Sequence, residues 1–320
     1  MSRKGRRPGS KRNYRLWAFL TLVVLVALFA YFIFTAAAGG SGSPLDNTPV
    51  SSTVLNELAG VTPSTLNTIG SGAAGIYSPE SISAAKLTLN NKPEILYMGA
   101  EYCPYCGAER WSMIVALDKF GNFTGIEYMQ SSGTDVFANT PTFTFVNANY
   151  TSKYISFVSV EQEDREENPL QTATTQETTL LNEYDTCPSS GTTGGIPFID
   201  FAGSYVVSCG SEYVPSALRV DQNENLAPYN WTQIASQLNN VSSIFAQNID
   251  GTANRLITAI CKVDGEAPNS VCSQSYADLT LGYARTLPSS TSQLAFNSVL
   301  VASPYTEAPR MSTGRPVLRI

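Results

Sequence analysis

Histidine is absent from this chain of 320 residues, and charged residues account for only 14% of it. The missing histidines bear on metal binding. Cys103 and Cys106 are spaced as half a zinc site, but the four other cysteines show no second closely spaced pair. A zinc site would therefore lack two of its ligands, so the sequence predicts no metal and no cofactor.

Basic residues are scarce beyond the N-terminus. Seven of the 20 Lys and Arg residues lie within residues 1–15, which leaves 13 against all 26 acidic residues, a net charge of −13 for the rest of the chain. Such an acidic surface argues against a nucleic-acid partner. The sequence also contains no internal repeat and no glycine-rich phosphate-binding loop.

The N-terminal segment has the pattern of a membrane anchor. Residues 1–15 form a basic tail without acidic residues, and residues 16–38 carry no charge over a length that spans a bilayer. The basic tail places the N-terminus in the cytoplasm. We therefore expect a single-pass cell-membrane protein, in contact with the lipid bilayer, with residues 39–50 as a linker and an extracytoplasmic C-terminal domain. A cleaved signal peptide ending near Ala36-Ala37-Ala38 is the alternative.

Two further features are consistent with an exterior, oxidising location. The cysteine count is even, as is usual where disulfides form. Four Asn-X-Ser/Thr triplets are candidate glycosylation sites in a glycoprotein. They lie at Asn122, Asn149, Asn230 and Asn240.

The Cys-X-X-Cys pair lies at the junction of a strand and a helix. The apolar run 95–98 predicts a buried strand, and apolar residues at helical spacing predict a helix over 111–120. Free N–H groups and the positive end of a helix dipole stabilise a thiolate at such a position. Cys103 would be the attacking sulfur and Cys106 the resolving one, and Pro104 is tolerated in a first helical turn.

The rest of the chain alternates between strand and helix patterns. Residues 125–129 predict a strand that is parallel to 95–98 in a strand-helix-strand unit. Residues 161–167 predict a solvated acidic loop. Further strands are expected at 86–89, 143–146, 154–160, 196–201 and 205–207, and helices at 51–58, 63–69, 172–181, 230–238 and 241–261, with ambiguous helices at 279–285 and 293–302.

Two motifs together resemble the thioredoxin fold. Tyr102-Cys103-Pro104-Tyr105-Cys106 resembles its active-site motif with a glutaredoxin-type dipeptide, and Ile196-Pro197 resembles its cis-proline loop beside the active-site sulfurs. The resemblance covers about 86–239. It implies an α/β fold, a thioredoxin-like mixed sheet flanked by helices. The expected domain is 51–240 with a helical insertion at about 133–184, followed by a helical C-terminal extension at 241–320.

The chain as a whole also resembles an archaeal family, domain-of-unknown-function family 929, which has the same anchor and motif. That family carries no established activity. One position departs from the thioredoxin pattern: the buried acidic residue expected six positions before the first cysteine is Tyr97 here. We expect Glu101 to be an exposed surface carboxylate, and a substitute for this acid is the alternative role for it. The glutathione-site pattern of glutaredoxins is not evident, so glutathione is not the expected substrate.

The predicted activity is thiol–disulfide exchange with extracytoplasmic protein thiols and disulfides. Tyr102, Pro104 and Tyr105 would contact the substrate, and the backbone of Ile196 beside Pro197 would pair with it like an added strand. Trp111 would line the same surface or pack internally. An unidentified membrane redox partner would recharge the pair. The alternatives are a non-catalytic binding or adaptor protein with a structural disulfide, and a metallochaperone for a soft metal such as Cu(I).

The remaining cysteines predict two structural bridges, although sequence alone leaves other pairings open. We expect Cys187–Cys209 and Cys261–Cys272, and a redox role for the first of these pairs is an alternative. The lack of histidine and the low charge content also suggest a protein that works in acid, since few of its groups would change charge there.

Overall fold

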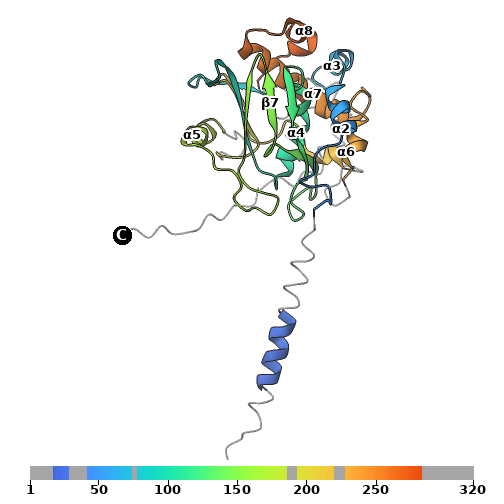
Figure 1. Cartoon of the computed structure of the whole chain (residues 1–320), viewed down its shortest axis with the longest axis vertical. Coiled ribbons are helices and arrows are strands. Elements are labelled where there is room, and N and C mark those ends of the chain that lie inside the picture. Colours follow the sequence, from blue (N-terminus) through green and yellow to red (C-terminus); the bar gives the residue numbers. More distant parts are fainter. Residues whose placement is uncertain (1–16, 29–41, 74–77, 186–192, 220–227, 283–320) are drawn as a thin grey trace, which may run out of the picture. The chain divides into compact units, whose positions relative to one another are not determined.

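Strand β3 (Lys92–Gly99) is the centre of the main sheet. The computed structural model describes residues 17–28, 42–73, 78–185, 193–219 and 228–282 (Figure 1). Strand β3 pairs in parallel with β8 (Ser156–Glu161) and antiparallel with β9 (Phe198–Phe201). β10 (Tyr205–Val207) and β1 (Glu80–Ser81) extend the sheet beyond β9, and β2 (Thr88–Leu89) forms a hairpin with the start of β3.

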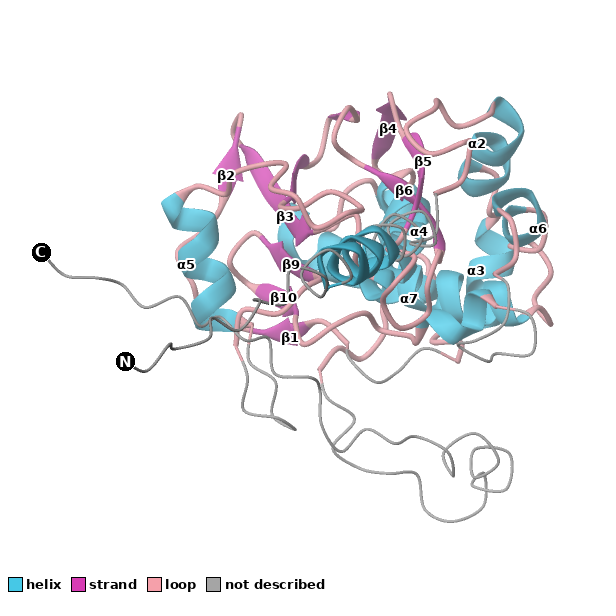
Figure 2. Ribbon diagram, turned by 90° about the horizontal axis from the view of Figure 1, so that it is seen from below, coloured by secondary structure: helices cyan, strands magenta, loops and turns pink. Residues whose placement is uncertain are grey.

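The two faces of β3 enter two different hydrophobic cores, as the alternation of side chains along a strand requires. Ile95 and Tyr97 face the larger core, whereas Leu96 and Met98 face the smaller one. Helix α5 (Thr175–Tyr184) covers the smaller core with Leu180 and Leu181. Figure 2 shows α5 on one side of the sheet and α4 and α7 on the other. The result is a mixed α/β fold in which helices flank the main sheet.

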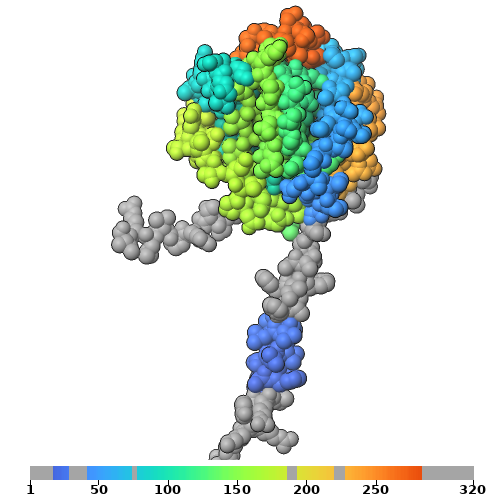
Figure 3. Space-filling view, in the orientation of Figure 1, coloured from blue at the N-terminus to red at the C-terminus, as the bar shows by residue number. Residues whose placement is uncertain are grey.

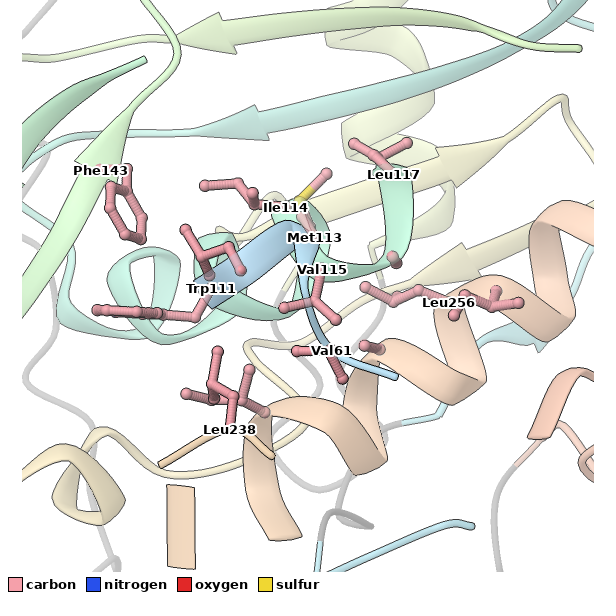
Figure 4. Close-up of a cluster of buried hydrophobic side chains, with 14 of the residues drawn as sticks. Val61, Trp111, Met113, Ile114, Val115, Leu117, Phe143, Leu238 and Leu256 are labelled. Atoms are coloured by element: carbon pink, nitrogen blue, oxygen red, sulfur yellow. The ribbon is translucent and has the colours of Figure 1, made fainter. Parts of the chain in front are cut away.

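Helix α4 (Pro104–Leu117) is buried along nearly its whole length. Trp111 is fully enclosed, donates from Nε1 to the carbonyl of Pro141 at 2.8 Å, and meets the ring of Phe143 edge-on at 4.6 Å. Figure 4 shows Trp111 and its neighbours on α4 packed among Phe143, Val61, Leu238 and Leu256. Trp111 is therefore a core residue and not part of a substrate surface.

Helix α7 (Ile244–Asp264) packs on α4 and on strands β3 and β9. The N-terminal helices lie in the same core, and Figure 3 shows α2 in blue beside the orange segment that holds α6. The bounds of these smaller helices are α2 (Ser52–Ala59), α3 (Pro63–Ile69), η1 (Pro215–Leu218), α6 (Trp231–Ala235), α8 (Asn269–Cys272) and η3 (Ser275–Ala277).

Two small antiparallel sheets complete the described fold. β4 (Gly121–Thr124) pairs with β7 (Asn149–Ser152), and β5 (Glu127–Gln130) pairs with β6 (Pro141–Thr144). The expected strand at 125–129 therefore exists, but its parallel pairing with β3 was wrong. The parallel neighbour of β3 is instead β8. The four strands between them in the chain, β4 to β7, form the two separate antiparallel sheets.

The N-terminal membrane prediction is corrected by the structure. Residues 17–28 are helical. Among the described residues, no helix is long and apolar enough to cross a membrane. The predicted transmembrane helix over 16–38 is therefore wrong, and so is the single-pass localisation that rested on it. Residues 29–38 lie outside the described residues.

The helical insertion and the helical extension also need correction. Segment 133–184 contains one helix, α5, but also β6, β7 and β8, and β8 belongs to the main sheet. In the expected extension, α7 is part of the main core and not an addition to it, because its buried side chains meet α4 and the sheet. Of the ambiguous helices, residues 279–282 are described and are not helical, whereas 283–285 and 293–302 lie outside the described residues.

The bridge between Cys261 and Cys272, confirmed by the structure, closes a loop with a sequence separation of 11 residues between α7 and α8. A loop of this length gives about 3 kcal/mol of stability in the chain-entropy description. We expect the double variant Cys261→Ser/Cys272→Ser to lose about that much free energy of unfolding, measured in urea. An unchanged free energy of unfolding would contradict a structural role for the bridge.

Three fully buried carboxyl groups lie between α4 and α7. Burial raises the pKa of Glu109 to about 7 and that of Asp250 to about 8. Burial and the neighbouring charge of Glu109 raise the pKa of Glu212 well above its ordinary value, although Arg255 lowers it. The carboxylate oxygens of Asp250 have no hydrogen-bond partner in the part of the chain that the structure describes.

These carboxyl groups make the folded state more stable at low pH than at high pH. A group whose folded pKa exceeds its unfolded value of about 4 contributes stability that is complete below that value and is lost as pH rises through the folded pKa. We expect the melting temperature to fall between pH 5 and pH 8.5. Asp250→Asn should flatten this fall, while the exposed control Asp278→Asn should not. A melting temperature that rises over the same interval would contradict the account.

Candidate functional site

Cys103 is the residue that caps the N-terminus of α4. Its sulfur accepts a hydrogen bond from the backbone N–H of Cys106 at 3.1 Å, and Pro104 follows it as the first helical residue. The sulfur therefore occupies the place of a capping oxygen, where unpaired N–H groups and the helix dipole favour negative charge. This is the geometry that the sequence predicts for an attacking thiolate.

Neighbouring strands and loops hold the first turns of α4 in place. Thr142 donates from its hydroxyl to the carbonyl of Gly107 at 2.8 Å, and Tyr213 donates to the carbonyl of Ala108 at 2.6 Å. A Cβ added to Gly107 would press on Thr142 at 3.3 Å, so a larger residue would force the two elements apart. The cysteine pair is thus carried on a rigid support.

The loop that faces Cys103 contains the second predicted motif. The Ile196–Pro197 peptide bond is cis, and the sulfur of Cys103 lies 3.9 Å from the carbonyl oxygen of Ile196. The buried carboxylate of Asp185 fixes this loop, because it accepts from the N–H groups of Gly195 at 2.5 Å and Cys209 at 2.6 Å. The structure therefore brings together the two motifs, which are more than 90 residues apart in sequence.

The two cysteines differ in access. Cys103 keeps 6% of its surface exposed and Cys106 keeps none. Tyr102, Tyr105 and Ile196 are half-buried and pack around the pair, while Pro104 and Pro197 are buried. Both cysteines are buried, and Cys103 is the more accessible of the two.

A loop after β5 borders the pair on another side. The N–H of Ser132 donates to the carbonyl of Tyr102 at 2.8 Å, and the ring of Phe137 meets Tyr105 edge-on at 6.0 Å. Val136 in this loop is 45% exposed. The rim of the site therefore combines Tyr102, Tyr105 and this loop into a partly apolar surface.

Cys106 has a strongly perturbed thiol. Burial raises the pKa of Cys106 well above its ordinary value, and the hydrogen bond and charge of Cys103 raise it further. Arg110, one helical turn later, lowers it. Without help, this thiol would stay protonated at neutral pH.

Arg110 and Glu161 form a buried ion pair beside the cysteines that sequence reasoning did not find. Both side chains are fully enclosed, and Arg110 donates from Nη2 and Nε to the two carboxylate oxygens at 2.6 and 2.9 Å. The sequence signal was weak, because Glu161 opens an acidic run that reads as a solvated loop. Glu161 instead ends β8, directly opposite Gly99.

Tyr97, six positions before Cys103, stands where the thioredoxin pattern has a buried acidic residue, and it is fully buried. Burial raises the pKa of Tyr97 well above its ordinary value, so it remains neutral. The expectation that Glu101 is exposed was wrong: it is 4% exposed, and its backbone N–H donates to the carbonyl of Glu163 at 2.9 Å. Burial also raises the pKa of Glu101, against the lowering effects of Thr144 and Arg110.

Comparison with known proteins identifies one family. The family described as "Domain of unknown function (DUF929)" matches residues 79–262, which contain both motifs and most of the main sheet. The chain belongs to the DUF929 family. No curated protein and no solved structure gives a match.

The other predicted residues of this DUF929 protein are four further cysteines and four glycosylation candidates. Cys209 is disulfide-bonded, and its predicted partner Cys187 lies outside the described residues. Within the described ranges, the one group of acidic or sulfur side chains spaced for a metal is Cys261, Glu266 and Cys272, and its two sulfurs are joined to each other. All four glycosylation candidates are exposed: Asn122, Asn149, Asn230 and Asn240.

The difference in access predicts selective alkylation. When the reduced protein is treated with iodoacetamide at neutral pH without denaturant, Cys103 should be modified and Cys106 should remain free. Peptide mass spectrometry gives the ratio at each site. Denatured protein serves as the control, in which both cysteines should react equally. Faster modification of Cys106 in the native protein would contradict the assignment of roles.

Proposed function

We propose that this DUF929 protein is a thiol–disulfide oxidoreductase that exchanges disulfides with protein substrates. The observation that supports this best is the Cys103 sulfur. It caps the N-terminus of α4, belongs to a residue with 6% of its surface exposed, and lies 3.9 Å from the Ile196 carbonyl, with a fully enclosed Cys106 behind it. A structural bridge requires neither the asymmetry in access nor the facing loop.

In the reducing direction, the Cys103 thiolate attacks one sulfur of a substrate disulfide and releases the other as a thiolate. Cys106, as a thiolate, then attacks the Cys103 sulfur, the Cys103–Cys106 bond forms, and the second substrate thiolate leaves. Two electrons pass to the substrate, and the proton lost by Cys106 ends on a released thiolate. The oxidising direction reverses these steps. A dithiol or disulfide partner protein restores the pair in either case.

The substrate surface follows from the residues around Cys103. The half-buried rings of Tyr102 and Tyr105 offer apolar contact, and Ile196 offers its backbone to an extended peptide. Because Ile196 lies against the sulfur, a peptide paired with it would bring its own cysteine to Cys103. This arrangement suits protein substrates with an extended segment and does not suit glutathione alone.

A thioredoxin-like relationship supports the same proposal. It rests on the Tyr102–Cys106 motif at a strand-to-helix junction, on the cis Ile196–Pro197 peptide, and on a β3 strand that is parallel to β8 and antiparallel to β9. The departure at Tyr97 means that proton handling in this protein differs from that of a chain with a buried acid at this position.

The second candidate function is a binding or adaptor protein whose Cys103–Cys106 bridge stays closed. The observation that favours it is the low exposure of Cys103, at 6%. In that case the pair would resist reduction and the protein would not turn over a disulfide substrate.

Cysteine variants separate the two candidates. Cys103→Ser should abolish insulin reduction with dithiothreitol as the electron source, because the attacking sulfur is gone. Cys106→Ser should instead accumulate a mixed disulfide at Cys103, detected as a mass increase that dithiothreitol removes. The cysteine-matched control, Cys261→Ser/Cys272→Ser, should retain turnover below its melting temperature. Equal rates for the parent and Cys103→Ser would contradict the proposed oxidoreductase.

A further inference from the structure

Three charged or polar side chains lie buried together around the inner end of the cysteine pair. Arg110 is on α4, Glu161 is at the end of β8, and Tyr97 is on β3. The guanidinium carbon of Arg110 lies 5.7 Å from the centre of the Tyr97 ring. All three side chains are fully enclosed.

The backbone of Ala100 connects this cluster to the cysteines. Its carbonyl accepts from Arg110 Nη2 at 2.7 Å and from the N–H of Cys103 at 3.4 Å. Ala100 also packs directly with Cys103 and Cys106 in one small core. Arg110 follows Cys106 by four residues, so both side chains lie on the same face of α4.

Stability alone does not explain a buried ion pair. Removing two charges from water costs more than their attraction returns unless further hydrogen bonds satisfy them. Here Arg110 Nη1 and the Tyr97 hydroxyl have no hydrogen-bond partner among the described residues. The cluster thus holds a paired guanidinium with one hydrogen-bond donor left unsatisfied, one helical turn from a buried thiol.

We propose that Arg110, held in place by Glu161, is a positioning residue that stabilises the Cys106 thiolate while it attacks the mixed disulfide. This inference rests on the proposed function. In that step the Cys106–Cys103 sulfur bond forms, the bond from Cys103 to the substrate sulfur breaks, and the substrate leaves as a thiolate. Arg110 takes no part in bond making and keeps its proton throughout.

The other groups that face Cys106 do not replace Arg110. Cys103 on the same helix is neutral once it is bonded to a substrate, and Tyr97 on β3 stays neutral because burial raises its pKa. Glu161 on β8 lies beyond Arg110, to which both of its oxygens bind. Glu101, which precedes α4, is also buried, and its pKa is raised by that burial although Thr144 and the charge of Arg110 lower it. Arg110 is the charged side chain that lowers the pKa of Cys106.

Exchange with 5,5′-dithiobis(2-nitrobenzoate) measures this step directly. The reduced protein releases one thionitrobenzoate when Cys103 reacts and a second when Cys106 displaces the first adduct, and both are followed at 412 nm by stopped flow. Below the pKa of Cys106, the second rate follows its thiolate fraction. Because nucleophilicity falls with pKa, one unit of increase slows resolution by about threefold to fourfold.

Two variants should shift the second rate in opposite directions. Arg110→Met/Glu161→Gln removes both charges without leaving one of them buried alone, and should slow resolution by at least about threefold. Glu161→Gln keeps the cation and removes its counter-charge, and should speed resolution. Arg110→Lys should lie between the parent and the double variant. Arg255→Met/Glu212→Gln removes a matched buried pair between α7 and the segment before η1, and should leave the second rate unchanged.

The first rate serves as the internal folding control, because it reports Cys103 alone. If the first rate is normal and every variant resolves at the parent's rate, the role of Arg110 is overturned while the exchange chemistry stands. The same holds if both Glu161 variants slow resolution equally, which is the result of a merely structural pair. If the parent forms no adduct at Cys103, the proposed function fails, and the inference fails with it.

Discussion

The structure depends on the enclosure of the first turns of α4. The N-terminus of this helix carries the sulfur of Cys103, a residue with 6% of its surface exposed, while the rest of the helix is buried among α7, the β5–β6 hairpin and the main sheet. Side chains from β6 and from the segment before η1 bind its first carbonyl groups, so the sulfur of Cys103 has little freedom to move. A fixed sulfur at a helix N-terminus, beside a fixed loop, is prepared for exchange without any rearrangement of the fold.

The same enclosure explains the unusual number of buried charges. A helix buried along its whole length carries its polar residues into the core, so Glu109, Arg110 and their partners lie where an ordinary surface helix has water. Carboxyl groups in such places stay protonated more readily. The fold is therefore expected to be more stable in acid, whereas the proposed cysteine chemistry needs a thiolate. The proposed role of Arg110, one turn after Cys106, meets both requirements.

Local patterns in the sequence predicted the elements around the site. The apolar run 95–98, the helical spacing of Trp111 and its neighbours, and the proline that opens the 196–201 strand each reflect local burial, which periodicity reports well. They placed the cysteine pair and the facing loop correctly. The hairpin of β9 and β10 was equally predictable, because the Ala202-Gly203-Ser204 segment between two apolar runs is typical of a turn. In the structure Ala202 and Gly203 have the positive φ angles of a tight turn.

Contacts between residues that are far apart in sequence could not be predicted. The run 125–129 has the same apolar pattern whether it pairs in parallel with β3 or antiparallel with β6, so its pairing was mistaken. Arg110 and Glu161 lie 51 residues apart, and each alone resembles a surface charge. Glu101 was misread for the same reason. The uncharged length of residues 16–38 predicted a bilayer span, but no helix among the described residues is long and apolar enough to form one.

The reduction potential of the Cys103–Cys106 pair tests the central claim most directly. The full-length protein would be equilibrated with glutathione or dithiothreitol buffers of known potential, and the free thiols would be trapped and counted by mass spectrometry, with Cys261–Cys272 as the internal reference. The account predicts a potential above about −300 mV for the Cys103 pair. A value below about −300 mV, like that of a structural bridge, would contradict it.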